Sequence, residues 1–365
     1  MKLAVIGASV GQLKLCQAAK RLGHEVICFA WDKGAVCKRV VDTFFPVSIM
    51  QKDLIVDICR KERIDGVISN ASDMTAEIVA YVADCLKLNG TSEKTIKHIR
   101  DKAWVREQTN QIPGLTPIDY IVYDGEQPPY FPCIIKPISG SSKIGLSFVD
   151  SPASFDKALS YSRSSSSSLL IERYVHGREY SIETLSFHGQ HFIIQYTEKK
   201  TTGIPHFVEI EHHQPALFPN RIKEDLLPIV QECLTRVGYT NGASHIEIKI
   251  DDDGRIYLIE INPRGGGDHI SDTLIQLSTG YDYLKGIIDI ALNCFSAPSI
   301  KEQYSQSAGI YYLCEQTKQL LPLFEGSQPN SVIEMEYDRQ HLVYSTGNAN
   351  RNGFLIYCSK NKLVL

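Results

Sequence analysis

Ala243-Ser-His-Ile-Glu-Ile-Lys-Ile250 leads into the turn Asp251-Asp-Asp-Gly254 and then into Arg255-Ile-Tyr-Leu-Ile-Glu-Ile-Asn262. An Asp-Gly pair between two alternating, isoleucine-rich runs is a strong signal for a β-hairpin. Side chains alternate across a strand, so one face of this hairpin is apolar and the other is polar. We expect the apolar face to belong to the core and the polar face to carry chemistry.

The length of the turn sets the register of the hairpin. Pairing Ile250 with Arg255 places His245 opposite Glu260, and it leaves Glu247 diagonal to Glu260. The predicted apolar face contains Ile246, Ile248, Ile250, Tyr257, Ile259 and Ile261. The predicted polar face contains His245, Glu247, Lys249, Glu260 and Asn262.

The polar face has the oxygen donors of a divalent metal site. Carboxylate and amide oxygens suit Mg²⁺ or Mn²⁺, so Glu247, Glu260 and Asn262 are the candidate ligands. Such metals are usually held by one or two carboxylates together with substrate phosphates, which indicates a nucleotide. A hairpin whose polar face is only solvated stays open as the alternative.

A proline and three glycines follow this hairpin, in the order Asn262-Pro-Arg264-Gly-Gly-Gly267. They turn the chain off the sheet and leave Arg264 beside the carboxylates, where it can bind a phosphate or carboxylate in a bidentate manner. A glutamate followed by Glu-x-Asn-Pro-Arg resembles the ATP-grasp superfamily. The resemblance implies two Mg²⁺ (or Mn²⁺) ions bound between these side chains and the phosphates of ATP, with Arg264 facing the reacting groups.

Bulk properties describe an ordinary globular chain of 365 residues with 43% hydrophobic and 22% charged residues. This length predicts two or three domains. The net charge of −4 gives no electrostatic case for nucleic acid, and no apolar run reaches the length of a membrane span. Ten cysteines without a CxxC pair are expected to be free thiols in a reducing cytoplasm.

Residues 1–96 alternate short apolar runs with helical stretches, which favours an open parallel sheet. Gly7-Ala-Ser-Val-Gly11 lacks the G-x-G-x-x-G spacing of dinucleotide sites. Asp32 after the second strand keeps an NAD-dependent oxidoreductase open as an alternative. The segment resembles the pre-ATP-grasp domain, in which the glycine turn serves the acceptor side.

Two lysines precede the hairpin in the order that the family requires. Lys102 lies in a stretch predicted to be helical from Lys94 to Asn110, and Lys136 ends the buried strand Pro132-Cys-Ile-Ile-Lys136. A lysine in so apolar a run needs an anionic partner. The resemblance assigns both lysines to ATP phosphates and, with Arg264, to catalysis. Small residues that can close over phosphate oxygens follow: Ser139, Gly140, Ser141, Ser142 and Gly145.

The stretch from Leu169 to Val175 is predicted to be an apolar strand followed by a hinge. By resemblance the adenine lies at this hinge, between Glu172 and Val175. Glu179 matches the carboxylate that binds the ribose. The nucleotide-binding residues expected here are Glu172, Arg173, Tyr174, Val175 and Glu179.

The segment from Thr201 to Ala216 is too polar and proline-bearing to be a central strand throughout. It resembles the loop that carboxylate-amine ligases place over the acceptor site. A solvated loop and a metal site of histidines and glutamates stay open as alternatives. The expected substrate residues are His206, Glu209, His212, Arg264, Gly266, Gly267, Asp268 and His269.

The resemblance covers nearly the whole chain and is closest to the L-amino-acid ligase and carbamoyl-phosphate-synthase-like branch. It implies an α/β ATP-grasp fold with a Rossmann-like domain (1–96), a catalytic domain (97–298) with a mobile α+β lid (about 115–185), and a small β-rich subdomain (299–365). The implied activity joins a carboxylate, activated by ATP as an acylphosphate, to an amine, with amino acids as the expected substrates.

Other functions remain open at this stage. They are a catalytically silent nucleotide sensor with the same fold and a carboxylate-thiol ligase. The expected partners are a small-molecule carboxylate and an amine, with no nucleic acid and no membrane. A homodimer is left open, and the expected location is the cytoplasm.

Overall fold

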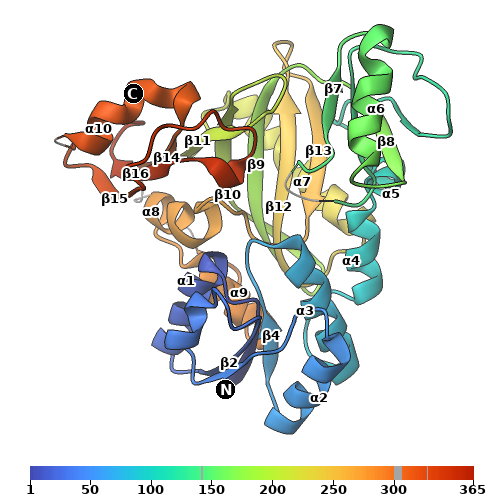
Figure 1. Cartoon of the computed structure of the whole chain (residues 1–365). Helices are drawn as coiled ribbons and strands as arrows, with labels where there is room; N and C mark the ends of the chain where they lie inside the picture. The colour runs from blue at the N-terminus through green and yellow to red at the C-terminus, as the bar shows by residue number, and fades with distance from the viewer. Residues whose placement is uncertain (141–142, 300–305, 327) are drawn as a thin grey trace.

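The computed structural model of the chain describes residues 1–140, 143–299, 306–326 and 328–365 (Figure 1). Three sheets organise these residues: a four-stranded sheet near the N-terminus, an eight-stranded central sheet and a second four-stranded sheet beside it. No helix among the described residues is long and apolar enough to cross a membrane. All ten cysteines are unpaired, as expected, and seven of them are buried.

The N-terminal part is the predicted open parallel sheet with strand order β3-β2-β1-β4. Its elements are β1 (Lys2–Ile6), α1 (Val10–Arg21), β2 (Glu25–Phe29), β3 (Thr43–Phe45), α2 (Lys52–Glu62), β4 (Gly66–Ile68) and α3 (Asp73–Leu86). The strand order reverses between β1 and β4, and such a reversal is where ligands bind in open α/β sheets. The carboxyl ends of these strands face the rest of the molecule (Figure 1).

The prediction of one continuous helix from Lys94 to Asn110 is wrong, because the helix is interrupted at Asp101. The chain forms two helices there, α4 (Glu93–Arg100) and α5 (Lys102–Thr109), separated by Asp101 in an extended conformation. The Asp101 side chain accepts a hydrogen bond from the backbone N–H of Trp104, so it caps α5. The break places Lys102 at the first position of α5.

The second four-stranded sheet has the order β5-β8-β6-β7 and its own small core around Phe155 and Ile171. Its elements are β5 (Tyr120–Val122), β6 (Cys133–Pro137), β7 (Ser147–Val149), α6 (Phe155–Arg163) and β8 (Leu169–Arg173). The sheet lies within the predicted lid, and it ends at Arg173. The next strand, Arg178–Phe187, belongs to the central sheet. The predicted end of the lid near residue 185 falls inside that strand and stays a prediction.

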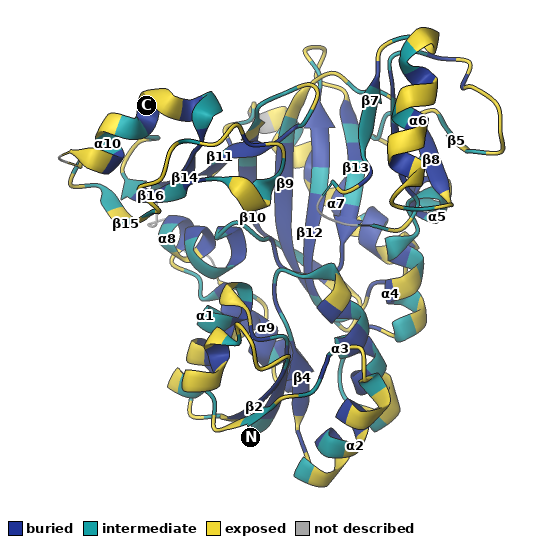
Figure 2. Ribbon diagram, viewed as in Figure 1, coloured by how far each residue is buried: buried dark blue, intermediate teal, exposed yellow. Residues whose placement is uncertain are grey.

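The central sheet is antiparallel throughout, in the order β13-β12-β9-β10-β11-β14-β16-β15. Its strands are β9 (Arg178–Phe187), β10 (Gln190–Thr201), β11 (Glu209–Gln214), β12 (Gly242–Ile250), β13 (Ile256–Asn262), β14 (Ser307–Leu313), β15 (Val332–Tyr337) and β16 (Gly353–Ser359). The middle strands are buried along most of their length (Figure 2). The predicted C-terminal strands exist, but they extend this sheet instead of forming a sheet of their own.

The position of β11 corrects the expectation that residues 201–216 form a polar loop. Residues 209–214 form an inner strand between β10 and β14, and its histidines are buried. His213 bonds to Tyr357 and Glu211, at 3.0 Å and 3.1 Å. These polar residues tolerate a central strand because β16 and β11 itself supply hydrogen-bond partners that the sequence pattern does not show.

Helices cover the two faces of the central sheet. They are α7 (Asn220–Arg236), a short π-helix (Ile270–Leu274), α8 (Ile275–Thr279), α9 (Tyr283–Ala291) and α10 (Leu321–Glu325). Short 3-10 turns lie at Val36–Arg39, Pro152–Ser154, Glu315–Leu320 and Asn348–Asn350. Between β8 and β9, Gly177 has φ +143°, and a Cβ there would lie 2.6 Å from the carbonyl oxygen of Ile250. Only glycine fits this crossing between the two sheets.

Candidate active site

The β12–β13 hairpin contains a bulge, and the predicted register is therefore wrong. Glu247 lies directly opposite Glu260, and His245 lies opposite Asn262. The register shifts between Glu247 and Ile248, so that Ile248 faces Leu258 and Ile259 is the extra residue.

The two faces of the hairpin also differ from the prediction. Already at the turn, before the bulge, Ile250 pairs with Ile256 instead of Arg255, so that Ile256 and Leu258 enter the core. Ile259, predicted to be in the core, lines a pocket on the other face. The side-chain pattern of β13 therefore inverts at this residue.

Glu247 and Glu260 each have a lysine partner from a distant strand or helix. Lys199 Nζ lies 2.7 Å from Glu247 Oε1, and Lys102 Nζ lies 3.0 Å from Glu260 Oε1. Burial opposes ionisation of Glu247, yet Lys199 and His245 hold its pKa well below the ordinary value. The two glutamates and Asn262 form a set of hard oxygen donors on adjacent strands, which fits Mg²⁺.

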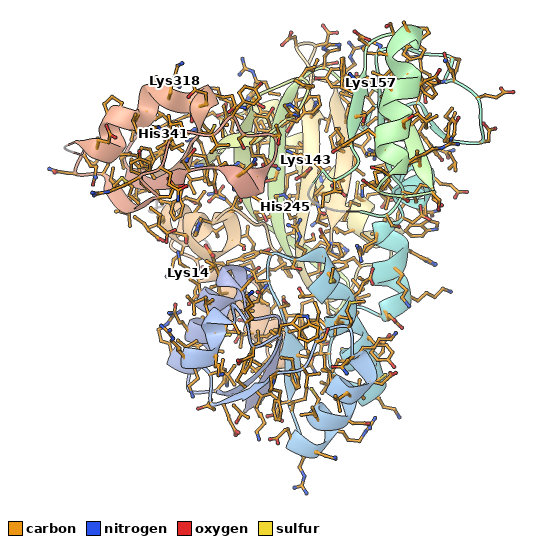
Figure 3. All side chains as sticks on the ribbon, in the orientation of Figure 1. Lys14, Lys143, Lys157, His245, Lys318 and His341 are labelled. Carbon is orange, nitrogen blue, oxygen red and sulfur yellow. The ribbon has the colours of Figure 1, made fainter. Side chains whose placement is uncertain are left out.

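His245 connects Glu247 to a second buried carboxylate. Its Nε2 lies 3.2 Å from Glu247 Oε1, and its Nδ1 lies 2.6 Å from Glu183 Oε1. Burial lowers the pKa of His245, but Glu183 and Glu247 together raise it to about 9. The charged imidazole therefore positions Glu247. His245 belongs to β12 and lies opposite Glu183 of β9 in the central sheet (Figure 3).

Lys136 belongs to a buried ion-pair cluster. Glu172 Oε2 lies 2.5 Å from Lys136 Nζ, and Glu172 Oε1 lies 2.7 Å from Arg106 Nε. Burial raises the pKa of Glu172, but Arg106 and Lys136 lower it to about 2. Burial lowers the pKa of Lys136. Two cations on one carboxylate leave an excess positive charge here, which a phosphate group would offset.

The small-residue loop contacts Lys102, whose Nζ donates a hydrogen bond of 2.9 Å to the carbonyl oxygen of Gly140. Among the described loop residues, Gly140, Lys143 and Ile144 line the pocket, whereas Ser139 and Gly145 do not. Ser141 and Ser142 lie outside the described residues. The predicted loop therefore contacts Lys102 at Gly140.

Apolar side chains form another part of the pocket lining, which we call the apolar slot. Its apolar lining is Ile118, Ile134, Ile144, Leu146, Val175, Phe207, Ile248 and Ile259. Glu172, Arg173, Tyr174 and Glu179 also line the pocket, but the carboxylate of Glu172 points to its two cations. At the hinge, Lys249 Nζ donates to the Val175 carbonyl oxygen at 3.1 Å and lies 3.3 Å from Glu179 Oε1.

Glu209 is bound by residues from several parts of the chain. Its Oε1 lies 2.9 Å from Lys199 Nζ and 3.3 Å from Lys143 Nζ, and its Oε2 accepts a hydrogen bond of 2.8 Å from Asn348. Burial opposes ionisation, but the two lysines hold the pKa of Glu209 well below the ordinary value. Lys143 lies near the middle of the molecule (Figure 3). Glu209 thus connects the small-residue loop to β11.

Glu209, His212 and Asp268 place one donor atom each within 4.8 Å of one another, which is compact enough for a metal ion. Both carboxylates already have cationic partners in the chain. Lys199 pairs with Glu209, and Arg351 pairs with Asp268 through two contacts of 2.8 Å and 2.9 Å. The ion pairs account for this cluster without a metal.

Arg264 points to the N-terminal domain, where its Nε lies 2.9 Å from Asp73 Oδ1. Burial lowers its pKa, but Asp73, Glu247 and Glu260 raise it above the ordinary value. Gly266 packs closely on the hairpin, because a Cβ there would lie 2.8 Å from His245 Nδ1. Its N–H donates to Glu183 Oε2 at 3.2 Å.

The remaining predicted substrate residues separate into two groups. Gly266, Gly267, Asp268 and His269 line a second cavity, next to the N-terminal domain. Asp268 and His269 both have positive φ, at 52° and 61°, a strained conformation for residues other than glycine. His206 lines neither cavity, and its ring lies 6.2 Å from the ring of Tyr344.

Several residues that the structure brings to the site have no distinguishing pattern in the sequence. They are Arg106, Glu183, Lys199 and Arg351. The sequence predicts His245 on the polar face of the hairpin, but not its contact with Glu183. Lys199 ends a run that contains Gln195, Thr197 and Glu198, so it lacks the apolar context that singled out Lys136. Arg351 lies in a polar stretch whose composition indicates only a turn.

Residues 130–272 match the family described as the ATP-grasp domain. Over 288 residues the chain is 24% identical to the formate-dependent phosphoribosylglycinamide formyltransferase of Corynebacterium jeikeium. This match covers 72% of the chain and 68% of that relative.

Two solved structures share the fold over almost the whole chain. The L-amino acid ligase of Bacillus licheniformis is 21% identical with a TM-score of 0.79, and the match covers 99% of this chain and 93% of the ligase. The biotin carboxylase domain of the Hydrogenobacter thermophilus 2-oxoglutarate carboxylase, solved with ADP and magnesium, is 17% identical with a TM-score of 0.73. That match covers 98% of this chain and 85% of the domain.

Proposed function

Because the chain contains an ATP-grasp domain, we propose that it is an ATP- and Mg²⁺-dependent ligase that joins a carboxylate to an amine and releases ADP and phosphate. We take amino acids to be the substrates, which the likeness to an L-amino acid ligase supports. The free cysteines support a location in a reducing cytoplasm.

One observation carries the proposal. A single pocket contains an apolar slot, the lysines Lys102 and Lys136, and the facing carboxylates Glu247 and Glu260. An adenine fits an apolar slot next to hinge backbone groups, and a triphosphate fits the lysines. The carboxylates and Asn262 would hold Mg²⁺, which supplies charge neutralisation between phosphate oxygens when it is bound.

The reaction needs positioning and charge neutralisation more than a nucleophile from the protein. An oxygen of the substrate carboxylate attacks the γ-phosphorus, and the bond to the leaving ADP oxygen breaks. The amine nitrogen then attacks the acyl carbon, phosphate leaves, and the amine loses a proton. Lys102, Lys136 and Arg264 offset phosphate charge, and the closed pocket keeps water from the acylphosphate.

The test measures ADP and phosphate release with ATP and Mg²⁺ in the presence of all pairs of common amino acids, with products identified by mass spectrometry. Hydroxylamine traps an acylphosphate as a hydroxamate, so it reports the first step without the correct amine. We expect ADP release that depends on the carboxylate and an amide product that depends on the amine. ATP binding without release of ADP for any pair would contradict the proposal and favour a nucleotide sensor. A product formed only with thiols would favour a carboxylate-thiol ligase.

A further inference from the structure

The bulge in β13 decides whether Glu260 reaches the active site. On the turn side of the bulge, Ile248 pairs with Leu258. If this register continued without a bulge, Glu260 would lie opposite Ile246 and would share its face of the hairpin. That face is the core, because Ile246 is fully buried there. The extra residue Ile259 instead turns Glu260 to the other face, where it lines the active-site pocket.

The extra residue of a bulge is left unpaired by the neighbouring strand. In addition, β13 is an edge strand of the central sheet. The carbonyl oxygen of Ile259 has its partner outside the sheet, where Arg106 Nη2 donates a hydrogen bond of 2.7 Å to it. The Arg106 side chain is only 2% exposed, and a hydrogen bond from a charged donor is about twice as strong as one between neutral groups. Arg106 therefore stabilises the bulge from outside the hairpin.

The ion-pair cluster holds this arginine in place. Arg106 Nε lies 2.7 Å from Glu172 Oε1, and Lys136 binds the other oxygen of the same carboxylate. One turn earlier in α5, Lys102 Nζ lies 3.0 Å from Glu260 Oε1. Two residues on one face of α5 thus hold two successive residues of β13. Arg106 is not among the residues that line the active-site pocket, so it acts on the site through β13.

We propose that Arg106 is a positioning residue of the metal site: its hydrogen bond to Ile259 holds the bulge and so keeps the two candidate metal-binding carboxylates opposite each other. This inference rests on the proposed ATP- and Mg²⁺-dependent function and deepens it by assigning the residue that orients these carboxylates. Arginine suits the role because its planar guanidinium group has donors in fixed directions, so Nε and Nη2 bind acceptors on two different strands. A lysine has one compact ammonium group and does not reproduce this fork.

The experiment measures metal binding without turnover, with Mn²⁺ as the probe and a non-hydrolysable ATP analogue present. Electron paramagnetic resonance reports free Mn²⁺ and so gives the Kd of the bound ion. Arg106→Lys keeps a positive charge beside Glu172 but loses the fork. We expect the Kd for Mn²⁺ to rise about tenfold to a hundredfold, as expected for one lost charge-assisted hydrogen bond. The affinity for ADP in EDTA should change little, because Lys102 and Lys136 remain.

Val105→Ala is the matched control for a purely structural effect. Val105 precedes Arg106 in α5, is 3% exposed and belongs to the core, so its truncation destabilises the same helix without removing a hydrogen bond to the bulge. It should lower the Tm and leave the Kd for Mn²⁺ unchanged. Hydrogen exchange in the metal-free protein is the second readout. The backbone amides around Ile259 should exchange faster in Arg106→Lys than in Val105→Ala.

A second variant, Arg106→Gln, protects the test against a folding defect. It removes the cation and leaves Glu172 paired with Lys136, so no charge is left without a partner, and it should raise the Kd for Mn²⁺ by a similar factor. An unchanged Kd in both Arg106 variants, or an equal rise in Val105→Ala, would overturn the role of Arg106 alone. A native protein that binds no Mn²⁺ with the analogue would overturn the metal-dependent function itself, and this inference with it.

Discussion

Lys199 Nζ lies 2.7 Å from Glu247 Oε1, although the two residues come from strands that are not neighbours in the central sheet. The same nitrogen lies 2.9 Å from Glu209 Oε1. The side chain of Lys199 is only 3% exposed, so it neutralises two carboxylates inside the protein. Burial lowers the pKa of Lys199, but Glu209 and Glu247 raise it well above the ordinary value.

Lys199→Met should therefore destabilise the protein strongly. The substitution leaves two carboxylates close together without this cation, and breaking a buried ion pair costs about 3–5 kcal/mol. Urea unfolding at neutral pH measures the change, and added Mg²⁺ should recover part of it. Lys200→Met is the control, because Lys200 is exposed and its pair with Glu211 contributes about 1 kcal/mol or less. Similar losses in the two variants would show that Lys199 does not have this role.

Glu260→Gln should abolish ADP formation and leave the fold intact. The residue faces the pocket and not the isoleucine core, and the amide loses the charge that a metal ion requires. ADP release and circular dichroism measure the two effects. Glu232→Gln, at a residue of α7 whose side chain is 43% exposed, should keep full activity. Activity that survives in Glu260→Gln would mean that this carboxylate does not hold the metal.

Glu172→Gln should weaken the dependence of the free energy of unfolding on pH below about 4.5. The folded-state pKa of Glu172 is about 2 against an ordinary value of 4.5, so its carboxylate contributes stability above pH 4.5. That contribution is lost as the pH falls through the folded-state pKa. Between these two pKa values, the free energy of unfolding should fall with decreasing pH more steeply in the native protein than in the variant. The difference in slope is up to about 1.4 kcal/mol per pH unit.

Urea unfolding at several pH values between 5 and 3 measures the two slopes. The variant should also be less stable at neutral pH, because Lys136 and Arg106 keep their buried charges without the carboxylate. Parallel pH profiles would contradict the assigned ion-pair cluster.

Lys143→Met should loosen the attachment of the proposed lid. Lys143 Nζ donates a hydrogen bond of 2.6 Å to the Phe207 carbonyl oxygen and lies 3.3 Å from Glu209 Oε1. We expect ATP and Mg²⁺ to slow subtilisin cleavage within residues 120–173, and we expect less protection in this variant. Lys157→Met is the control, because Lys157 is an exposed residue of α6 in the same lid (Figure 3). Cleavage that ATP does not change would argue against a mobile lid.

The sequence by itself determined that residues 243–262 form a hairpin with a polar face. Isoleucine alternation and the Asp-Gly turn act locally, so they can be read from the chain. The same holds for the apolar strand that ends at Lys136 and for the parallel N-terminal sheet. The fold and the class of nucleotide pocket followed from these local patterns and from the family resemblance.

Only the tertiary structure decided which carboxylates face one another. The bulge at Ile259 shifts the register by one residue, and a bulge at a residue as ordinary as isoleucine has no signature in the sequence. Arg351 and Asp268 are 83 positions apart, and Lys199 and Glu247 are 48 apart. Pairs of this kind form because the fold brings distant strands and loops together. Charges that look solvent-exposed in the sequence are then buried against each other.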